Sequence, residues 1–520
     1  MPNAQINITP KRSVAFFAFL SIFMVGVSYL LLLLLAVACI YLPYLLLLNT
    51  QTLQMQVILL FLGGIAVAST MLWSLLPRRD KFDPPGPLLD RSTQPKLFRE
   101  IDKIAGALNE QVPCEVYLVG QPNAFVTDRG GTLGFGSRRV MGIGLPLFFI
   151  LNVSELRAVL AHEFAHFYSG DTSLGPWLYR ARTVLIRSFQ NMANLQEIGH
   201  IHILRLLFTL VAVVIKRYFI FFLGVTNFVS RKQERRSDEL ACLIAGKQPA
   251  IHGLKKIHGA ALFWPVYWEG EVAPIIGRNC IPDIGEGFRR FLAAPSIAEF
   301  VNASIAEEPR SAQTSPLDTH PPLADRIAAM EQLQAQDPQP DELQASSLFD
   351  QPQSAELLFV EKMNQQIPKS TLRHVAWDEV GTLVTIPFWR SEVAKFGSLL
   401  LGKKAVSLPD LLKQLPQIGS RLPDPKGTLL TPKERTDRAT HLLGMAVSLM
   451  LLEKGWKLYT QPAVFHFRRA EETLDAFGLV NDLVAGKLSP EDWVQKCSEL
   501  GIAEDTLGDL KPQTIPVSSA

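Results

Sequence analysis

The sequence predicts a mainly helical α+β protein with three parts: an N-terminal transmembrane hairpin, a central domain with a small β-sheet, and a separate C-terminal α+β region. Three observations support this prediction. Residues 13–77 contain no charged side chain, short strand-like segments lie between residues 115 and 144, and a Gln-, Pro- and Ser-rich stretch begins near residue 334. A chain of 520 residues, 48% of them hydrophobic, is long enough for two or three domains.

The charge and cysteine content restrict the classes of partner and compartment. A net charge of +2 predicts no strong attraction to nucleic acid, so no polynucleotide partner is expected. The five cysteines are scattered, and their odd number argues against a disulfide framework. Cys39 lies in an apolar run, and the other four are expected to be reduced thiols in a cytosolic domain: Cys114, Cys242, Cys280 and Cys497.

Residues 1–82 are predicted to form a membrane hairpin. The uncharged stretch is too long for one span of about 20 residues and suits two, near residues 14–37 and 57–76. It also far exceeds the apolar core of a cleavable signal peptide. Basic residues flank the stretch on both sides, and none lies in the polar turn at residues 49–54. Both ends of the hairpin are therefore expected on the cytoplasmic side of a multi-pass protein of the cytoplasmic membrane.

The central domain, residues 83–335, is predicted to begin with a helix near Pro95–Leu108 and a small sheet. Glu115–Val119 reads as a strand because it is rich in β-formers. Asn123–Thr127 and Arg139–Gly144 read as further short strands around a Gly-containing turn. This sheet directly precedes the segment on which the domain is centred.

That segment is Val153–Gly170, VSELRAVLAHEFAHFYSG, and it is predicted to be a helix. Asn152 and Glu155 have the spacing of a capping box, and Gly170 is suited to end the helix. Residues four apart lie on one helical face, so His162 and His166 are aimed at one point, with Glu163 beside it. A helix of this kind supplies two zinc ligands and a general base.

A catalytic zinc site needs a third protein ligand as well as a water. Ser169 and Thr172 occupy the positions where a Gly and a third His would continue the helix motif, so that option fails. Glu234 in the stretch SRKQERRSDELA is the strongest candidate, because Asp238 follows at i+4 and can support a ligand imidazole. Spacing alone leaves alternatives open: Glu197, Glu239 and Asp171.

Four blocks, in order, resemble the family of membrane-embedded zinc metallopeptidases that includes the bacterial stress protease HtpX and the CAAX prenyl endopeptidase. The resemblance covers roughly residues 90–335. The four blocks are Asn123-Ala124-Phe125, ELRAVLAHEFAHFYSGDT, SRKQERRSDELA, and Thr319-His320-Pro321-Pro322-Leu323 with Arg326-Ile327.

The resemblance implies roles for individual residues. Glu234 would be the third ligand of one Zn²⁺ per chain, held with His162 and His166, and Asp238 would support the site from behind. His320 would stabilise the oxyanion of the intermediate. The sheet with Asn123, Ala124 and Phe125 would offer an edge strand to a polypeptide substrate.

These expectations describe a membrane-anchored zinc metalloendopeptidase with a zincin-like domain on the cytoplasmic side, acting on membrane or misfolded proteins in quality control. Its partners would be polypeptide substrates and the lipid bilayer. Two alternatives remain open: a non-catalytic membrane scaffold with a structural metal site, and a specific prenyl-protein or peptide processing protease. Two predicted spans suit the second alternative poorly, because the family's prenyl proteases enclose a chamber with many more.

Two apolar runs precede Glu234, Leu206–Ile215 and Tyr218–Val229, with Lys216 and Arg217 between them. Each run alone is too short to span a bilayer, and charges near a bilayer centre are costly. The family that the sequence resembles often has further hydrophobic segments here, so extra spans are an alternative. We prefer long helices that lie against the membrane face or pack on each other. Either arrangement keeps Glu234 close to the bilayer.

Residues 336–356 read as a linker, and residues 357–520 as a soluble region of unknown role. Helices are predicted at Arg435–Lys454, at Ala470–Ala485 and after Ser489-Pro490. The apolar stretch Leu442–Leu452 is too short to cross a membrane. His374, His441 and His466 lack metal-ligand spacing and are expected to be structural or surface residues.

Overall fold

The computed structural model describes residues 12–49, 55–76, 82–131, 136–168, 175–198, 202–307, 321–334, 339–363, 372–400, 402–424 and 430–508. The chain forms two compact units. Unit 1 contains Met1–Leu262 and Val301–Met363, and unit 2 contains Phe263–Phe300 and Asn364–Ala520. This division differs from the predicted domain boundaries, because residues 263–300 pack with the C-terminal part of the chain. The prediction followed changes in composition, which do not report such packing.

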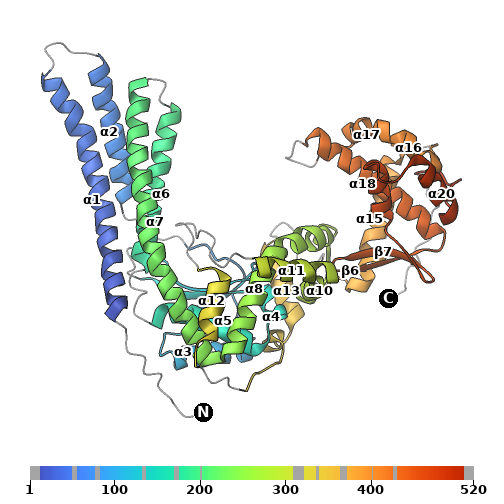
Figure 1. The fold of residues 1–520 in the computed structure, drawn as a ribbon, viewed down its shortest axis with the longest axis horizontal. Coiled ribbons are helices and arrows are strands. Elements are labelled where there is room, and N and C mark those ends of the chain that lie inside the picture. The colour runs from blue at the N-terminus through green and yellow to red at the C-terminus, as the bar shows by residue number, and fades with distance from the viewer. Residues whose placement is uncertain are drawn as a thin grey trace. The chain divides into compact units, whose positions relative to one another are not determined.

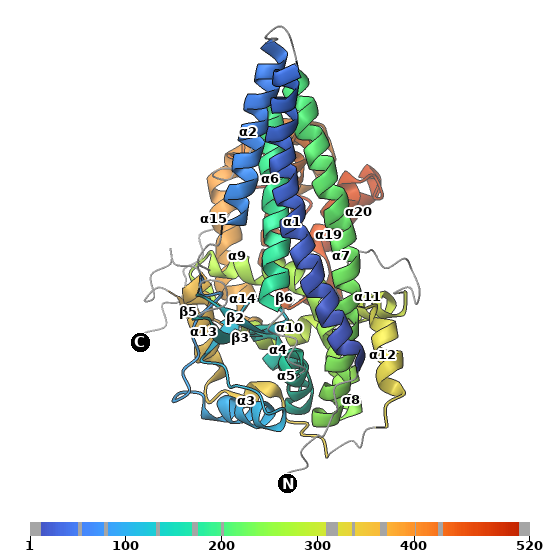
Figure 2. The same cartoon turned by 90° about the vertical axis from the view of Figure 1, so that its left-hand side faces the viewer.

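Four long helices of unit 1 lie side by side in both views, as Figures 1 and 2 show. They are α1 (Arg12–Asn49), α2 (Met55–Leu75), α6 (Gly175–Ile198) and α7 (His202–Ala245). One cluster of buried apolar side chains joins all four, with Leu32, Val67, Leu185 and Ile215 as one member from each helix. The expected N-terminal pair of apolar helices is therefore confirmed.

Helix α7 shows how the two apolar runs that precede Glu234 are connected. The structure joins both runs in one continuous helix of 44 residues. Lys216 and Arg217 lie exposed on its surface and do not end it, because Lys and Arg are good helix formers. In length and composition α7 is able to cross a membrane, as are α2 and the Ile22–Asn49 part of α1.

Polar contacts and close packing hold the helices of this bundle together. The Tyr218 hydroxyl of α7 donates to the Met24 carbonyl of α1 at 2.8 Å. The Asn191 amide of α6 donates to the Ser74 hydroxyl of α2 at 3.0 Å. Gly64 packs directly on the backbone of Cys39, where a Cβ would lie 1.8 Å from the carbonyl oxygen. Small residues at such a crossing allow two apolar helices to approach closely.

The sheet of unit 1 has the strand order β1-β3-β2. Strand β1 (Glu115–Val119) runs parallel to β3 (Arg138–Gly144), and β2 (Ala124–Arg129) runs antiparallel to β3. Strand β2 is thus an edge strand. The Arg139 guanidinium of β3 lies 4.0 Å from the ring centroid of Phe167, which fastens the sheet to the motif helix α5 (Val153–Tyr168).

The N-terminus of α5 is capped as predicted. The Asn152 side chain accepts the Glu155 N–H at 2.7 Å, and the Glu155 carboxylate accepts the Asn152 N–H at 2.9 Å. Lys256 of α8 (Lys247–Tyr267) pairs with Glu155 at 2.7 Å. Arg157 of α5 pairs with Glu100 of α3 (Pro95–Ala107) at 3.0 Å. Together these contacts fix the start of the helix that carries both histidines.

Part of the predicted linker packs against α5. The Val153 N–H donates to the Leu343 carbonyl at 2.8 Å, and the Ser154 N–H donates to the Asp341 carbonyl at 3.2 Å. These amides belong to the first turn of α5 and have no acceptor within the helix. Residues 341–349 also cover α4 (Leu145–Ile150), where the rings of Phe148 and Phe349 lie 4.3 Å apart. The chain then forms α13 (Pro352–Met363). Residues 341–349, called the strap below, are therefore part of unit 1.

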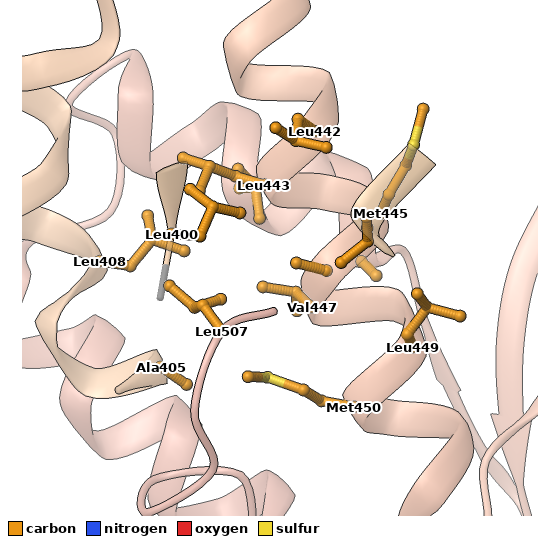
Figure 3. Close-up of a cluster of buried hydrophobic side chains, with 14 of the residues drawn as sticks. Leu400, Ala405, Leu408, Leu442, Leu443, Met445, Val447, Leu449, Met450 and Leu507 are labelled. Atoms are coloured by element: carbon orange, nitrogen blue, oxygen red, sulfur yellow. The ribbon is translucent and has the colours of Figure 1, made fainter. Parts of the chain in front are cut away.

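Unit 2 has its own hydrophobic core around α18 (Pro432–Glu453), shown in Figure 3. Leu443, Val447 and Leu449 of α18 are at most 1% exposed, and the labelled Leu400, Leu408 and Leu507 pack around this helix. A helix that is apolar on all sides belongs in a core or a membrane. The stretch Leu442–Leu452, which is too short to span, lies in this core.

The other helices predicted in unit 2 are partly confirmed. Ser489 caps α20 (Pro490–Leu500) as expected, because its hydroxyl accepts the Asp492 N–H at 3.1 Å. The predicted helix at Ala470–Ala485 is wrong in its first part, where β8 (Glu472–Leu474) pairs with β7 (Val464–Arg469). Helix α19 (Ala476–Val484) begins only after Asp475, whose carboxylate accepts the Gly478 N–H.

Removal of the α5 cap should loosen the start of the motif helix. We expect Asn152→Ala to cost about 1 kcal/mol locally, which is about a fivefold rise in amide opening at the start of α5. Hydrogen exchange of peptides covering residues 150–160 measures this rise. Asn152→Ser, which keeps a side-chain acceptor, is the matched control. Equal exchange in Asn152→Ala and the parent protein would contradict the role of the cap.

Candidate metal centre

Helix α5 presents His162 and His166 one turn apart on the same face. Their ring centroids lie 4.9 Å apart and the rings are perpendicular. His162 is largely buried, whereas His166 is partly exposed, with 30% of its side-chain surface accessible. The two imidazoles therefore converge while one side of the site remains accessible.

Helix α7 places a carboxylate opposite both imidazoles. Glu234 is 4% exposed, and its Oε2 lies 3.4 Å from Nε2 of His162. Its Oε1 lies 3.6 Å from Nε2 of His166. One candidate ligand atom from each of the three residues lies within 4.8 Å of the others, and within the described ranges no other set of His, Cys, Asp and Glu meets this criterion.

The donor set fits a zinc ion. Imidazole nitrogen and carboxylate oxygen bind zinc at about 2.0–2.2 Å in a tetrahedral arrangement, which separates neighbouring ligand atoms by about 3.4 Å. The distances of 3.4 Å and 3.6 Å from Glu234 to the two imidazoles match this spacing. Three protein ligands leave one tetrahedral position for a water or a substrate, as in catalytic zinc sites.

Asp238 lies one turn beyond Glu234 and holds the first histidine from behind. Its Oδ1 lies 3.0 Å from Nδ1 of His162, so Nε2 of the same ring is directed toward Glu234. Burial lowers the pKa of His162, but hydrogen bonds to Asp238 and Glu234 outweigh it and raise that pKa to about 9 in the absence of a metal. A metal ion must therefore displace a proton when it binds this imidazole.

Arg326 of α12 (Leu323–Glu331) is a charged partner to which the sequence analysis assigned no role. Its guanidinium donates two hydrogen bonds to Asp238, at 2.6 and 2.9 Å, and lies 3.7 Å from Glu234. Burial raises the pKa of Asp238, but the bonds from Arg326 and His162 outweigh it and hold that pKa below its usual value. The only signal in the sequence was the position of Arg326 in the fourth block of the resemblance.

Glu163 lies on α5 directly beside His162, and its side chain is half-buried. Burial of the Arg326 guanidinium lowers its pKa. The negative charges of Asp238, Glu234 and Glu163 outweigh this effect and raise the pKa of Arg326 above its usual value. Three carboxylates from α5 and α7 therefore interact electrostatically with the buried guanidinium of Arg326. Glu239, an alternative ligand, pairs instead with Arg236 at 2.6 Å.

The residues predicted to bind substrate lie at the start of the edge strand. The side-chain oxygen of Asn123 accepts a hydrogen bond from the Ala124 N–H. The backbone carbonyl of Asn123 accepts one from the Gly144 N–H. Ala124 is buried, whereas Phe125 is half-buried and lies over Gly142, where an added Cβ would come within 2.3 Å of its ring. Ala124 and Phe125 are therefore directed to opposite faces of the sheet.

Several candidates lie outside what the structure describes. His320 and Asp171 belong to residues 308–320 and 169–174, which fall outside the described ranges. Glu197 belongs to α6, but its side chain is not described. The roles expected for these residues remain predictions.

Comparison with known proteins agrees with this geometry. Residues 91–334 match the model of peptidase family M48, and this range includes α5, the Glu234 turn of α7 and Arg326. The match supports a metallopeptidase, that is, a hydrolase of peptide bonds. No solved structure matches the chain.

The assignment of the third ligand leads to a graded prediction. We expect Glu234→Ala to abolish stable zinc binding, because the site loses one of three ligands. Asp238→Ala should weaken binding by about 10–100-fold, because the ligand His162 loses its support. Asp171→Ala should leave zinc occupancy nearly intact, because His162, His166 and Glu234 already supply the three protein ligands.

Zinc dissociation in the presence of a competing chelator, measured side by side for the three variants, provides the ranking. Loss of the metal from Asp171→Ala together with its retention by Glu234→Ala would overturn the assignment of Glu234.

Proposed function

We propose that this protein is a membrane-anchored zinc metalloendopeptidase. The observation that carries the proposal is the approach of His162, His166 and Glu234, whose candidate ligand atoms lie within 4.8 Å of one another. The family match over residues 91–334 supports the class of enzyme. The presence of Glu163 beside this site favours a catalytic metal over a purely structural one.

His162, His166 and Glu234 would hold the zinc ion, which would supply Lewis acidity to a bound water and to the scissile carbonyl. Glu163 accepts the proton of the attacking water and transfers it to the leaving amine. Asp238 and Arg326 keep the His162 ring oriented throughout, because both are held by buried, charge-assisted hydrogen bonds. His320 stabilises the developing oxyanion, as the resemblance implies.

The edge strand β2 is the proposed binding surface for substrate. Among the described strands it is an edge strand that pairs with β3, which makes it the position where a further strand would add to the sheet. Addition of an extended peptide to such an edge gives main-chain hydrogen bonds without a demand for particular side chains. The substrates are therefore polypeptides of varied sequence, which suits quality control of membrane or misfolded proteins.

The apolar helices support anchoring in a bilayer. Three described helices are long and apolar enough to cross a membrane. Their surfaces carry exposed apolar side chains such as Leu34, Trp73 and Leu210, which are 56%, 61% and 58% exposed. We place the protein in the cytoplasmic membrane with the peptidase domain on the cytoplasmic side, because basic residues flank the uncharged stretch at both ends.

The proposed mechanism predicts that Glu163→Gln separates metal binding from catalysis. All three ligands remain, so the variant should retain zinc, whereas the loss of the base should abolish cleavage of an unfolded model protein. Atomic emission measures the metal, and a gel-based assay measures cleavage. Full activity in Glu163→Gln would refute the mechanism, and an inactive parent protein with tightly bound zinc would favour the scaffold alternative.

The proposed topology predicts opposite behaviour of reporters at two positions. A reporter fused after Arg79 should behave as cytoplasmic, and one inserted at Thr50 should behave as external. Paired reporters, one active only outside and one fluorescent only inside, give this result independently of expression level. Reversed signals would place the metal centre on the outer side.

A further inference from the structure

Ser237 lies between the third candidate ligand and Asp238 in sequence, and its hydroxyl reaches the second histidine. Its Oγ lies 3.2 Å from Nδ1 of His166. Ser237 is 1% exposed, so its hydroxyl is buried beside the partly exposed His166 ring. Neither the motif helix nor the carboxylate spacing on α7 pointed to this residue.

The contact completes a symmetrical arrangement around the two imidazoles. Nδ1 of His162 faces Asp238 and Nδ1 of His166 faces Ser237, while Nε2 of each ring faces Glu234. One turn of α7 therefore contacts both nitrogens of both rings. Metal-binding histidines are commonly oriented in this way, by a partner on the ring nitrogen that does not bind the metal.

Ser237 differs from other Ser and Thr residues of α7 in the partner of its described hydrogen bond. Hydroxyl side chains within helices commonly donate to the carbonyl four residues earlier. Thr209, Thr226 and Ser230 follow this pattern, with bonds to Arg205, Phe222 and Thr226 at 2.7, 2.9 and 3.1 Å. The described hydrogen bond of the Ser237 hydroxyl leads instead to another helix, at the candidate metal centre.

We propose that Ser237 is a positioning residue of the metal centre, an inference that rests on the proposed function. A metal bound at Nε2 leaves the proton of neutral His166 on Nδ1, and the Ser237 hydroxyl accepts the hydrogen bond from that N–H. The bond fixes both the tautomer and the orientation of the ring. Glu234 and the two positioning residues thus share a single helical turn.

The two histidines are supported unequally. His162 is held by a carboxylate, which is itself bonded to Arg326, whereas His166 is held by a neutral hydroxyl. A charged acceptor forms the stronger hydrogen bond with an imidazole N–H and makes the ring a better ligand. Loss of the neutral hydroxyl of Ser237 should therefore have a smaller effect than loss of the Asp238 carboxylate.

The test compares variants of the full-length protein with and without the hydroxyl. Ser237→Ala removes it, and Ser237→Thr and Ser237→Val form a pair of nearly equal volume that differ in it. Ser230→Ala is the matched control, because that hydroxyl bonds only within α7 among the described contacts. The probes are Zn²⁺ release to a competing chelator and the visible absorption spectrum after substitution with Co²⁺.

We expect Ser237→Ala and Ser237→Val to weaken zinc binding by about 10-fold, the lower end of the range for such supporting residues, and to alter the cobalt spectrum. Ser237→Thr should restore both toward the parent values, and Ser230→Ala should change neither. A structural role alone would not produce recovery in Ser237→Thr with loss in the equally bulky Ser237→Val.

If Ser237→Ala and Ser237→Val match Ser230→Ala while the parent binds zinc, the proposal for Ser237 is overturned and the metal centre stands. If the parent itself binds neither ion, the proposed function is overturned, and the assignment of Ser237 falls with it.

Discussion

The burial of carboxylate charge between α5 and α7 is the constraint on which the rest of unit 1 depends. Glu234 and Asp238 are 4% and 5% exposed, and buried carboxylates are costly unless cations and hydrogen-bond donors surround them. Arg326 and the two imidazoles meet that need from α12 and α5. Three segments far apart in sequence must therefore meet at one place. The helix bundle, the sheet and the strap hold these helices in positions where the three segments meet.

Local patterns in the sequence predicted those parts of the site that lie within one helix. The i, i+4 spacing of His162 and His166 and the Asn152–Glu155 capping box both depend on residues a few positions apart. The meeting of Glu234 with the histidines is a long-range contact, which spacing left open among several acidic residues. Asp238 at i+4 and the resemblance of the surrounding blocks were what favoured Glu234. Arg326 and Ser237 act through contacts between helices, for which periodicity carries no signal.

The differences from the predicted fold have the same origin. Lys216 and Arg217 divide two apolar runs in composition, yet α7 continues through them because neither residue opposes helix formation. Residues 263–300 and 341–349 were assigned by composition, whereas aromatic and backbone contacts decide where they pack. Tyr267 of the first segment, for example, packs on Trp377 with ring centroids 6.1 Å apart. Composition reports what a segment is made of and gives no information on the surface that it covers.

The strap has a practical consequence for any shortened version of the protein. The region that matches the peptidase family ends at residue 334, before the strap begins at residue 341. A truncation at that family boundary removes the Leu343 and Asp341 carbonyls that accept the first amides of α5, and it uncovers Phe148. Buried amides without acceptors and an exposed aromatic ring both disfavour folding. A shortened version of the peptidase region should therefore extend beyond residue 334 and include the strap.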